Sequence, residues 1–435
     1  AGAAPGALTT PAWDDTRQEF ARAAALAGPA LSRRLHLHDA TGRPSSPPPS
    51  DTAVMQFWQE LQGSAPLAAA TDGDRVTTFR IPDARARQQR QVTELEAHTQ
   101  RLVHHAEPER AAFFWQQVKP APAAHWNQAV ATYKARLWDD LIGRLSGDDV
   151  PARPRSRPIV DRPAWTGHEV VLDVRPDIFA WGVLLVPKDL RPGERRPVVV
   201  CQHGLNGVPE DTYTEDPTLR ATGIYQSFAA RLAERGFIVF APHNPYRGDE
   251  SFRRLTRKLN PLGQTLFSVI LEQHEQILHW LRDQPFVDPQ RIGFYGLSYG
   301  GKTAMRVPSL LDGYALSICS ADFNEWLKKT TTVDAPMSYV FTREYEIAEF
   351  NLGRTFNYAE MAALIAPRPF MVERGHHDGV APDEWVAYEY AKVRRLYAQL
   401  GIPERTRIEY FNGPHAIHGV GTFEFLHTHL NWPPR

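Results

Sequence analysis

Residues 291–302 read Arg-Ile-Gly-Phe-Tyr-Gly-Leu-Ser-Tyr-Gly-Gly-Lys. Four residues that suit a short buried strand, 292–295, run directly into Gly-Leu-Ser-Tyr-Gly, and a helix-compatible segment follows at 303–311. A serine hydroxyl is a weak nucleophile, so an enzyme that uses one holds it on a tight turn where a histidine can take its proton. The glycines two residues before and two residues after Ser298 leave that room. The pattern therefore predicts a nucleophilic serine at Ser298 rather than an ordinary Gly/Ser turn.

Two downstream loops supply the partners that such a serine needs. In an α/β sheet the acid and the base follow strands and come in the order Ser, acid, His. Asp378 lies on a Gly-flanked turn after one predicted strand, and His415 lies in the loop after the last one. We favour Asp378 over Glu373, which still lies within its strand, and His415 over His418, which comes later in its loop. The order and the placement at strand ends predict a Ser298, Asp378, His415 triad.

An acyl-transfer site also needs backbone N–H donors for the oxyanion. One donor usually comes from the residue after the nucleophile, here Tyr299, whose N–H also begins a helix. The other should come from the loop after a valine-rich strand, and we select Leu205. The preceding His203 is expected to support this loop and to contact the substrate rather than to act as a second base, and Gly204, which lacks a Cβ, permits the turn.

A further loop follows a strand at the same edge of the sheet and carries Tyr246 and Arg247. We expect both side chains to line the substrate pocket. A guanidinium at this place can receive a substrate carboxylate, and a structural ion pair is the alternative.

The segments from about residue 164 onward alternate between strand and helix patterns. Strands are predicted at 168–174, 178–186, 197–202, 237–241, 292–295, 314–320, 369–375 and 405–411, and helices at 225–236, 266–283, 303–311, 361–365, 383–400 and 420–430. This alternation specifies an α/β fold with a doubly wound, mostly parallel sheet. Residues 322–356 interrupt this alternation of strands and helices. We interpret them as a cap-like insertion that shapes the pocket rather than as structural decoration.

The N-terminal part of the chain differs in composition and in its predicted secondary structure. Residues 1–150 are predicted to form a mostly helical region whose Pro/Ala-rich start is extended, 151–163 a Pro/Arg-rich linker, and 164–435 the catalytic domain. The chain begins Ala-Gly-Ala-Ala-Pro-Gly, which is what remains after a leader is removed, so we expect a secreted or periplasmic bacterial protein, with the cytoplasm as the alternative.

Composition excludes several classes of partner. The 435 residues carry 49 basic and 50 acidic side chains, a net charge of -1, so nothing favours nucleic acid or an anionic membrane. No apolar run approaches the roughly 20 residues that span a bilayer. Cys201 and Cys319 fall in strand-like apolar runs and are expected to be buried thiols.

These residues resemble the α/β-hydrolase superfamily and, within it, the dienelactone-hydrolase-like and acetyl xylan esterase-like bacterial serine esterases. The resemblance runs from about Gly167 to the C-terminus and rests on four motifs: His203-Gly204 after a strand, Gly296-Leu297-Ser298-Tyr299-Gly300-Gly301, Gly375 to Asp378 with Pro382, and Gly413-Pro414-His415. It implies an α/β-hydrolase fold and hydrolysis of carboxylic esters through an acyl-enzyme on Ser298, without a cofactor. Dienelactone hydrolases proper carry a cysteine nucleophile on a shorter chain, so that particular activity is not expected.

The expected substrates are acetyl or aryl esters of carbohydrates, or other small esters. Three alternatives stay open: a prolyl oligopeptidase-like serine peptidase, a catalytically silent binding protein with the same fold, and a zinc enzyme suggested by His376-His377-Asp378. We expect no metal, no cofactor, no nucleic acid and no membrane partner. The sequence leaves the oligomeric state open.

Overall fold

The computed structural model describes residues 12–37, 51–62, 83–119, 121–147, 150–347 and 349–434. They divide into two compact units, Ala1–Gln88 and Gln89–Arg435. The first unit holds α1 (Trp13–Ser32), α2 (Asp51–Gln62) and the start of α3 (Ala84–Arg110). The Ala-rich start, which we expected to be extended, forms a helix over α1 because alanine has the highest helix propensity. The other parts of this start, residues 1–11 and 38–50, lie outside the described residues.

Within the described residues, the second unit is built on a nine-stranded sheet in the order β1-β2-β3-β5-β4-β6-β7-β8-β9. The strands are β1 (Arg155–Asp161), β2 (Trp165–Arg175), β3 (Ile178–Pro187), β4 (Arg196–Gln202), β5 (Ile238–Pro242), β6 (Val287–Leu297), β7 (Leu316–Ser320), β8 (Phe370–Gly375) and β9 (Thr406–Phe411). The β1/β2, β2/β3 and β3/β5 pairs are antiparallel, and β5, β4, β6, β7, β8 and β9 are parallel. The prediction of a doubly wound, mostly parallel sheet is confirmed.

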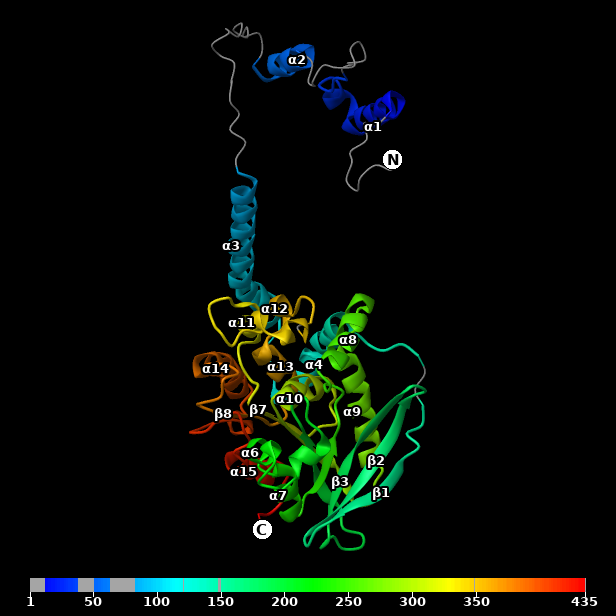
Figure 1. Cartoon of the computed structure of the whole chain (residues 1–435), viewed down its shortest axis with the longest axis vertical. Coiled ribbons are helices and arrows are strands. Elements are labelled where there is room, and N and C mark those ends of the chain that lie inside the picture. Colours follow the sequence, from blue (N-terminus) through cyan, green and yellow to red (C-terminus); the bar gives the residue numbers. More distant parts are fainter. Residues whose placement is uncertain are drawn as a thin grey trace. The chain divides into compact units, whose positions relative to one another are not determined.

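Helices cover both faces of this sheet (Figure 1). One face carries α9 (Leu266–Arg282), α10 (Tyr299–Leu310), α13 (Tyr358–Ile365) and α14 (Asp383–Gln399), and the other carries α6 (Arg220–Tyr225), α7 (Phe228–Glu234) and α15 (Gly421–His429). In β4, Val198 and Val200 pack into the core on the α10 face, and Val199 and Cys201 pack into the core on the α7 face. Covering on both faces is why the strand is continuously apolar instead of alternating.

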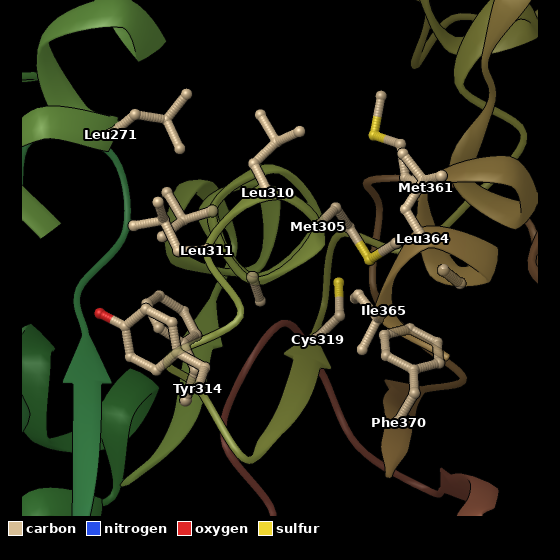
Figure 2. Packing of buried hydrophobic residues seen from close by; sticks show 14 of the residues in the cluster. Leu271, Met305, Leu310, Leu311, Tyr314, Cys319, Met361, Leu364, Ile365 and Phe370 are labelled. Atoms are coloured by element: carbon tan, nitrogen blue, oxygen red, sulfur yellow. The ribbon is translucent and has the colours of Figure 1, made fainter. Parts of the chain in front are cut away.

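The core on the α10 face is continuous across several elements. Figure 2 shows Met305 from α10, Cys319 from β7, Leu364 from α13 and Phe370 from β8 packed together. Both Cys201 and Cys319 are free and buried, as expected. This packing fixes α10, which begins directly after Ser298, against the sheet.

The predicted boundary at 151–163 is wrong in the structure. Residues 155–161 form β1, which pairs with β2 as an edge strand, and its ladder is irregular between Pro158 and Val160. Proline is tolerated on an edge strand because no neighbour needs its missing N–H, so a Pro/Arg-rich stretch is compatible with a strand there.

The helical segment before β1 also belongs to the catalytic unit. The side chains of Phe114, Trp126 and Leu137 lie in the same core as the sheet. The indole Nε1 of Trp126 donates to the Ala363 carbonyl oxygen at 2.7 Å. Phe114 lies in η2 (Ala111–Trp115), Trp126 in α4 (Trp126–Ala129) and Leu137 in η4 (Leu137–Ile142), and α5 (Ala131–Arg136) joins the last two. None of the described helices combines the length and the apolar character required to cross a bilayer.

A buried histidine connects α9 to the strand ends near the site. His274 is fully buried; its Nδ1 lies 2.8 Å from the Tyr314 hydroxyl and its Nε2 lies 3.1 Å from Asn244 Oδ1. Because an amide oxygen only accepts, Nε2 carries the proton and Nδ1 accepts from the tyrosine. Burial lowers the pKa of His274 from 6.5 to about 3, so the ring is neutral in the folded protein.

The stability of the fold should therefore fall in mild acid. Below pH 6.5 the unfolded chain protonates His274 while the folded chain does not, so the stability present above pH 6.5 is lost progressively down to about pH 3. Between pH 7.5 and 5.5 this amounts to about 1.4 kcal/mol from His274. Urea unfolding at the two pH values should show His274→Gln with a smaller pH dependence than the parent by that amount. The control His98→Gln removes an exposed histidine of α3 and should keep the parent's dependence; an unchanged dependence in His274→Gln would contradict the account.

Candidate active site

Ser298 occupies a strained turn between β6 and α10. Its φ is 62° and its ψ is -121°, a left-handed conformation that costs a non-glycine residue about 1–3 kcal/mol. The backbone N–H of Ser298 donates to the Ser320 carbonyl oxygen at 2.9 Å, and its carbonyl oxygen accepts from the Lys302 N–H at 2.8 Å. The turn is thus held by its neighbours in β7 and α10, and the serine side chain is left partly exposed.

The glycines around Ser298 are required by close backbone contacts. A Cβ at Gly296 would lie 2.2 Å from the Gly300 carbonyl oxygen, and a Cβ at Gly300 would lie 2.3 Å from the Gln202 carbonyl oxygen. Real Cβ atoms do not approach this closely, so a side chain at Gly296 would push α10 away from β6, and one at Gly300 would push it away from β4. The Gly-x-Ser-x-Gly spacing is therefore a packing requirement of the turn.

Asp378 and His415 are brought together at the ends of β8 and β9. His415 Nδ1 lies 2.9 Å from Asp378 Oδ1, and the Asp378 carboxylate is buried. Because a carboxylate accepts, we assign the proton to Nδ1, which leaves Nε2 as an acceptor. The same Oδ1 accepts from the Val380 N–H at 2.9 Å, and Oδ2 lies 3.0 Å from Arg374 Nη1. The carboxylate is fixed from three sides.

A single cavity of about 440 Å³ contains both Ser298 and His415. Its walls come from the loop after β4, from the turn and helix near α6, and from the end of β6. The lining residues are Gly204, Leu205, Asn206, Gly207, Asp211, Arg220, Ala221, Ile224, Tyr225, Leu297, Ser298 and His415. Ser298 and His415 therefore line one cavity at the same rim of the sheet, with Asp378 behind the histidine.

The loop after β4 lies against the serine. A Cβ at Gly204 would be 3.1 Å from Ser298 Cβ, a contact so tight that a side chain there would displace the loop or the serine by a few tenths of an ångström. The Gly204 N–H donates to the Tyr225 hydroxyl at 2.8 Å. Among the described residues no acceptor is found for the N–H groups of Leu205 and Tyr299, which is a condition that the predicted oxyanion donors must meet.

His203 is fully buried beneath this loop and does not line the cavity. Its Nδ1 donates to the Gly204 carbonyl oxygen at 2.8 Å, and its Nε2 accepts from the Asn244 N–H at 3.2 Å. Burial lowers the pKa of His203 to about 3, which keeps the ring neutral. The histidine supports the loop, and its burial excludes the contact with substrate that we had also considered.

Tyr246 and Arg247 do not take the pocket-lining places that we expected. Tyr246 is fully buried because its hydroxyl donates to the His203 carbonyl oxygen, which turns the ring inward. Arg247 is exposed but is not among the residues that line the cavity with Ser298. The sequence predicted that their loop follows a strand at this edge of the sheet, but it could not predict the direction of the two side chains.

The two rival residues are engaged elsewhere. Glu373 is buried, and its carboxylate accepts from Ser320 Oγ at 2.7 Å, Tyr295 Oη at 2.9 Å and the Gly419 N–H at 3.0 Å. Burial raises its pKa. His418 pairs through Nδ1 with Glu409 Oε1 at 3.1 Å. Neither residue lines the cavity of Ser298.

The described residues of the segment, 322–347 and 349–356, brace α10 and are not among those that line the cavity of Ser298. Lys302 is fully buried, and its Nζ lies 3.7 Å from the ring centre of Tyr299, 4.7 Å from that of Trp326 and 5.1 Å from that of Tyr339. Burial lowers the pKa of Lys302 to about 8. Lys329 of α11 (Trp326–Thr331) donates to the Val380 carbonyl oxygen. The segment thus connects the helix after Ser298 to the loop of Asp378.

Two residues that support the site were missed by the sequence analysis. Arg374 donates through Nη2 to the Asp378 carbonyl oxygen at 2.9 Å and through Nε to Asp383 Oδ1 at 3.0 Å, besides its contact with the Asp378 carboxylate. Tyr225 holds the Gly204 N–H. An arginine four residues before the predicted acid, at the end of a buried strand, was the available signal for Arg374; Tyr225 had none.

The structure gives no support to a zinc site. His376 Nδ1 pairs with Asp383 Oδ2 at 2.5 Å, and His377 Nε2 lies 2.8 Å from Asn412 Oδ1. Among the residues described by the structure, no group of three or more His, Cys, Asp or Glu side chains is arranged to hold a metal ion.

Arg374→Gln should destabilise the protein strongly. It removes the cation beside the buried Asp378 carboxylate, and a buried charge left without its partner costs about 3–5 kcal/mol. Urea unfolding at pH 7.5 should show this loss, with Arg374→Lys in between because it keeps the charge without the planar fork of donors. An unfolding midpoint equal to the parent's for Arg374→Gln would refute the role given to this arginine.

Sequence similarity to known proteins covers less than half of this chain. A family model described as the prolyl oligopeptidase family matches residues 225–422, which include Ser298, Asp378 and His415. A curated candidate hydrolase, YtaP from Bacillus subtilis, is 26% identical over 187 residues. That match covers 42% of this chain and 60% of YtaP, so the chain spans less than two thirds of this relative's length.

Solved structures match over more of the chain. A glucuronoyl esterase from Solibacter usitatus is 13% identical with a TM-score of 0.54, covering 72% of this chain and 95% of that one. A candidate acetyl xylan esterase from Bacteroides fragilis is 18% identical with a TM-score of 0.52, covering 70% of this chain and 81% of that one. At these identities the likeness shows the fold, and the sequence matches support a serine hydrolase. The chain has the α/β-hydrolase fold and resembles the α/β-hydrolase superfamily, as its motifs predicted.

Proposed function

We propose that this protein is a serine carboxylic-ester hydrolase that acts through an acyl-enzyme. Ser298 Oγ attacks the ester carbonyl carbon while His415 Nε2 takes the hydroxyl proton. The tetrahedral intermediate expels the alcohol, which receives that proton from His415. Water, deprotonated by the same imidazole, then attacks the acyl-enzyme, and the acid leaves as Ser298 regains its proton.

The observation that carries this proposal is the 2.9 Å pair between His415 Nδ1 and Asp378 Oδ1, together with the cavity shared by His415 and Ser298. The carboxylate fixes the ring in the tautomer whose Nε2 can accept, and it stabilises the imidazolium formed during attack. Because Arg374 and the Val380 N–H hold Asp378 in place, the ring orientation is fixed before substrate binds.

The developing oxyanion requires donors that are already in place. We assign this role to the N–H groups of Leu205, which follows the loop glycine beside Ser298, and Tyr299; neither has another acceptor among the described residues. Tyr299 begins α10, so the helix dipole adds to the positive potential at its N–H. Each preorganised donor of this kind typically contributes a factor of about 10²–10³ to the rate. Lys302 and the aromatic rings around it keep the start of α10 fixed.

The proposed substrates are acetyl or aryl esters of carbohydrates, or other small esters. Two features support this class. The structural neighbours are named as a glucuronoyl esterase and a candidate acetyl xylan esterase. The cavity also combines apolar side chains, Leu205, Ile224 and Leu297, with the polar side chains of Asn206, Asp211 and Arg220. A small acyl group and a polar alcohol both find suitable contacts in such a cavity.

A serine peptidase is the second candidate, because the matching family model is the prolyl oligopeptidase family. The same three residues can cleave an amide when the leaving amine is protonated by the histidine. A panel of small acetyl and aryl esters beside short chromogenic peptide amides separates the two. We expect ester turnover with little or no amide turnover; the reverse would favour the peptidase.

Substitutions in the triad should abolish ester turnover without unfolding the protein. Ser298→Ala should lower kcat by about 10⁴–10⁶, and Asp378→Asn by about 10²–10⁴, because the asparagine favours the wrong tautomer of His415. His415→Ala should behave like Ser298→Ala. The matched control is His418→Gln, which changes a neighbouring histidine that pairs with Glu409 and should stay within about threefold of the parent. A His418 variant as inactive as the His415 variant would refute the assignment of the base.

A further inference from the structure

The cavity at Ser298 contains an ionised side chain that the proposed chemistry leaves unused. Arg220, the first residue of α6, lines this cavity together with Ser298 and His415. Its guanidinium is exposed, and no hydrogen bond or ion pair of this side chain is found among the described residues. Its five N–H donors therefore point to a group that the chain does not supply.

The other polar side chains of the lining already have partners in the protein. Asp211 Oδ2 accepts from the Val208 N–H at 2.9 Å, and Asn206 Oδ1 accepts from the Gly248 N–H at 3.2 Å. The Tyr225 hydroxyl accepts from the Gly204 N–H at 2.8 Å. Arg220 is thus the one cation lining this cavity, among the described residues, whose donors are all unoccupied.

The charge of Arg220 reaches the part of the cavity next to the serine. Burial raises the pKa of Tyr225 to about 12, and the positive charge of Arg220 acts in the opposite direction. The Tyr225 hydroxyl contacts Gly204, which lies against Ser298. Because Arg220 and Ser298 line the same cavity, a substrate whose ester carbonyl is at Ser298 extends into the part of the cavity where the guanidinium acts.

We propose that Arg220 binds a carboxylate on the substrate, so that the protein prefers esters that carry a carboxylate near the scissile bond. The inference rests on the proposed esterase function and names the substrate class of that site. A guanidinium presents a planar fork that matches a carboxylate with two parallel N–H···O bonds, and these charge-assisted bonds are about twice as strong as neutral ones. A neutral hydroxyl would use only part of this donor set.

The presence of Asp211 in the same cavity narrows the choice among anions. Its carboxylate repels a second negative charge, and the repulsion is greater for a phosphate dianion than for a monoanionic carboxylate. The lining thus combines one unpaired cation with one carboxylate held by the backbone. This balance favours a singly charged ligand.

A matched pair of esters tests the preference directly. The acetyl ester of 4-hydroxybenzoate carries a carboxylate, and its methyl ester analogue is neutral with the same acyl group and ring. The measured quantity is the ratio of kcat/KM for the charged ester to kcat/KM for the neutral one, compared between variants so that intrinsic reactivity cancels. Arg220→Gln should lower this ratio about 10- to 100-fold, mostly through KM, and Arg220→Lys should lower it less.

The matched control is Arg247→Gln. Arg247 is exposed and close to the same edge of the sheet but does not line the cavity, so its loss should leave the ratio unchanged. For the parent, added salt should lower kcat/KM for the charged ester only, because an exposed charge pair is screened. Acetyloxyphenyl phosphate, a dianion, should be a poorer substrate than the carboxylate.

The outcomes are distinguishable. A ratio that Arg220→Gln leaves unchanged, or that Arg247→Gln lowers equally, overturns the role of Arg220 while the esterase proposal stands. An Arg220→Gln variant that loses both esters to the same extent also overturns it, because a structural role explains that result. If the parent hydrolyses neither ester nor any other small ester, the proposed function fails and this inference fails with it.

Discussion

The left-handed backbone of Ser298 is the constraint on which the rest of the site depends. A serine at a φ of 62° is strained, and the strain is sustained only because α10 is fully packed against the sheet. The contacts that hold it are tight: Gly296 and Gly300 allow backbone approaches that no other residue could make. The helix is fixed further by Lys302, enclosed by aromatic rings from α10 and from the segment after β7. Relaxing this turn would move the nucleophile and the Tyr299 N–H together.

The acid and the base reach the serine because β8 and β9 are adjacent parallel strands. Gly375 at the end of β8 pairs with Phe411 at the end of β9, so the two following loops leave the sheet side by side. They touch closely, since a Cβ at Gly375 would lie 2.4 Å from the Pro414 carbonyl oxygen. Arg374, one residue before Gly375, lies 3.0 Å from the Asp378 carboxylate and anchors the loop that carries it. Two strand ends and one buried arginine are thus sufficient to aim Asp378 at His415.

Much of this arrangement could be predicted from the sequence, because strand ends and glycine-flanked turns are local signals. The sheet, its helices and the loops of Ser298, Asp378 and His415 were predicted from periodicity and order alone. Predictions of which segments pack together, and of where a side chain points, were less accurate. A Pro/Arg-rich stretch became an edge strand because proline costs little there, and helices before it joined the catalytic core. Tyr246 turned inward to a backbone oxygen, and Arg220, on a short helix without a motif, reached the cavity instead.

The central claim is that the geometry of the turn makes Ser298 nucleophilic, with His415 as its base. Stoichiometric labelling with a fluorophosphonate, followed by mass spectrometry of the digested protein, tests it most directly. The account predicts one label per chain, on Ser298, formed rapidly in the native protein, slowed at least about 100-fold in His415→Ala and absent after unfolding in urea. Labelling at another residue, or labelling of Ser298 at the same rate without His415, would contradict it.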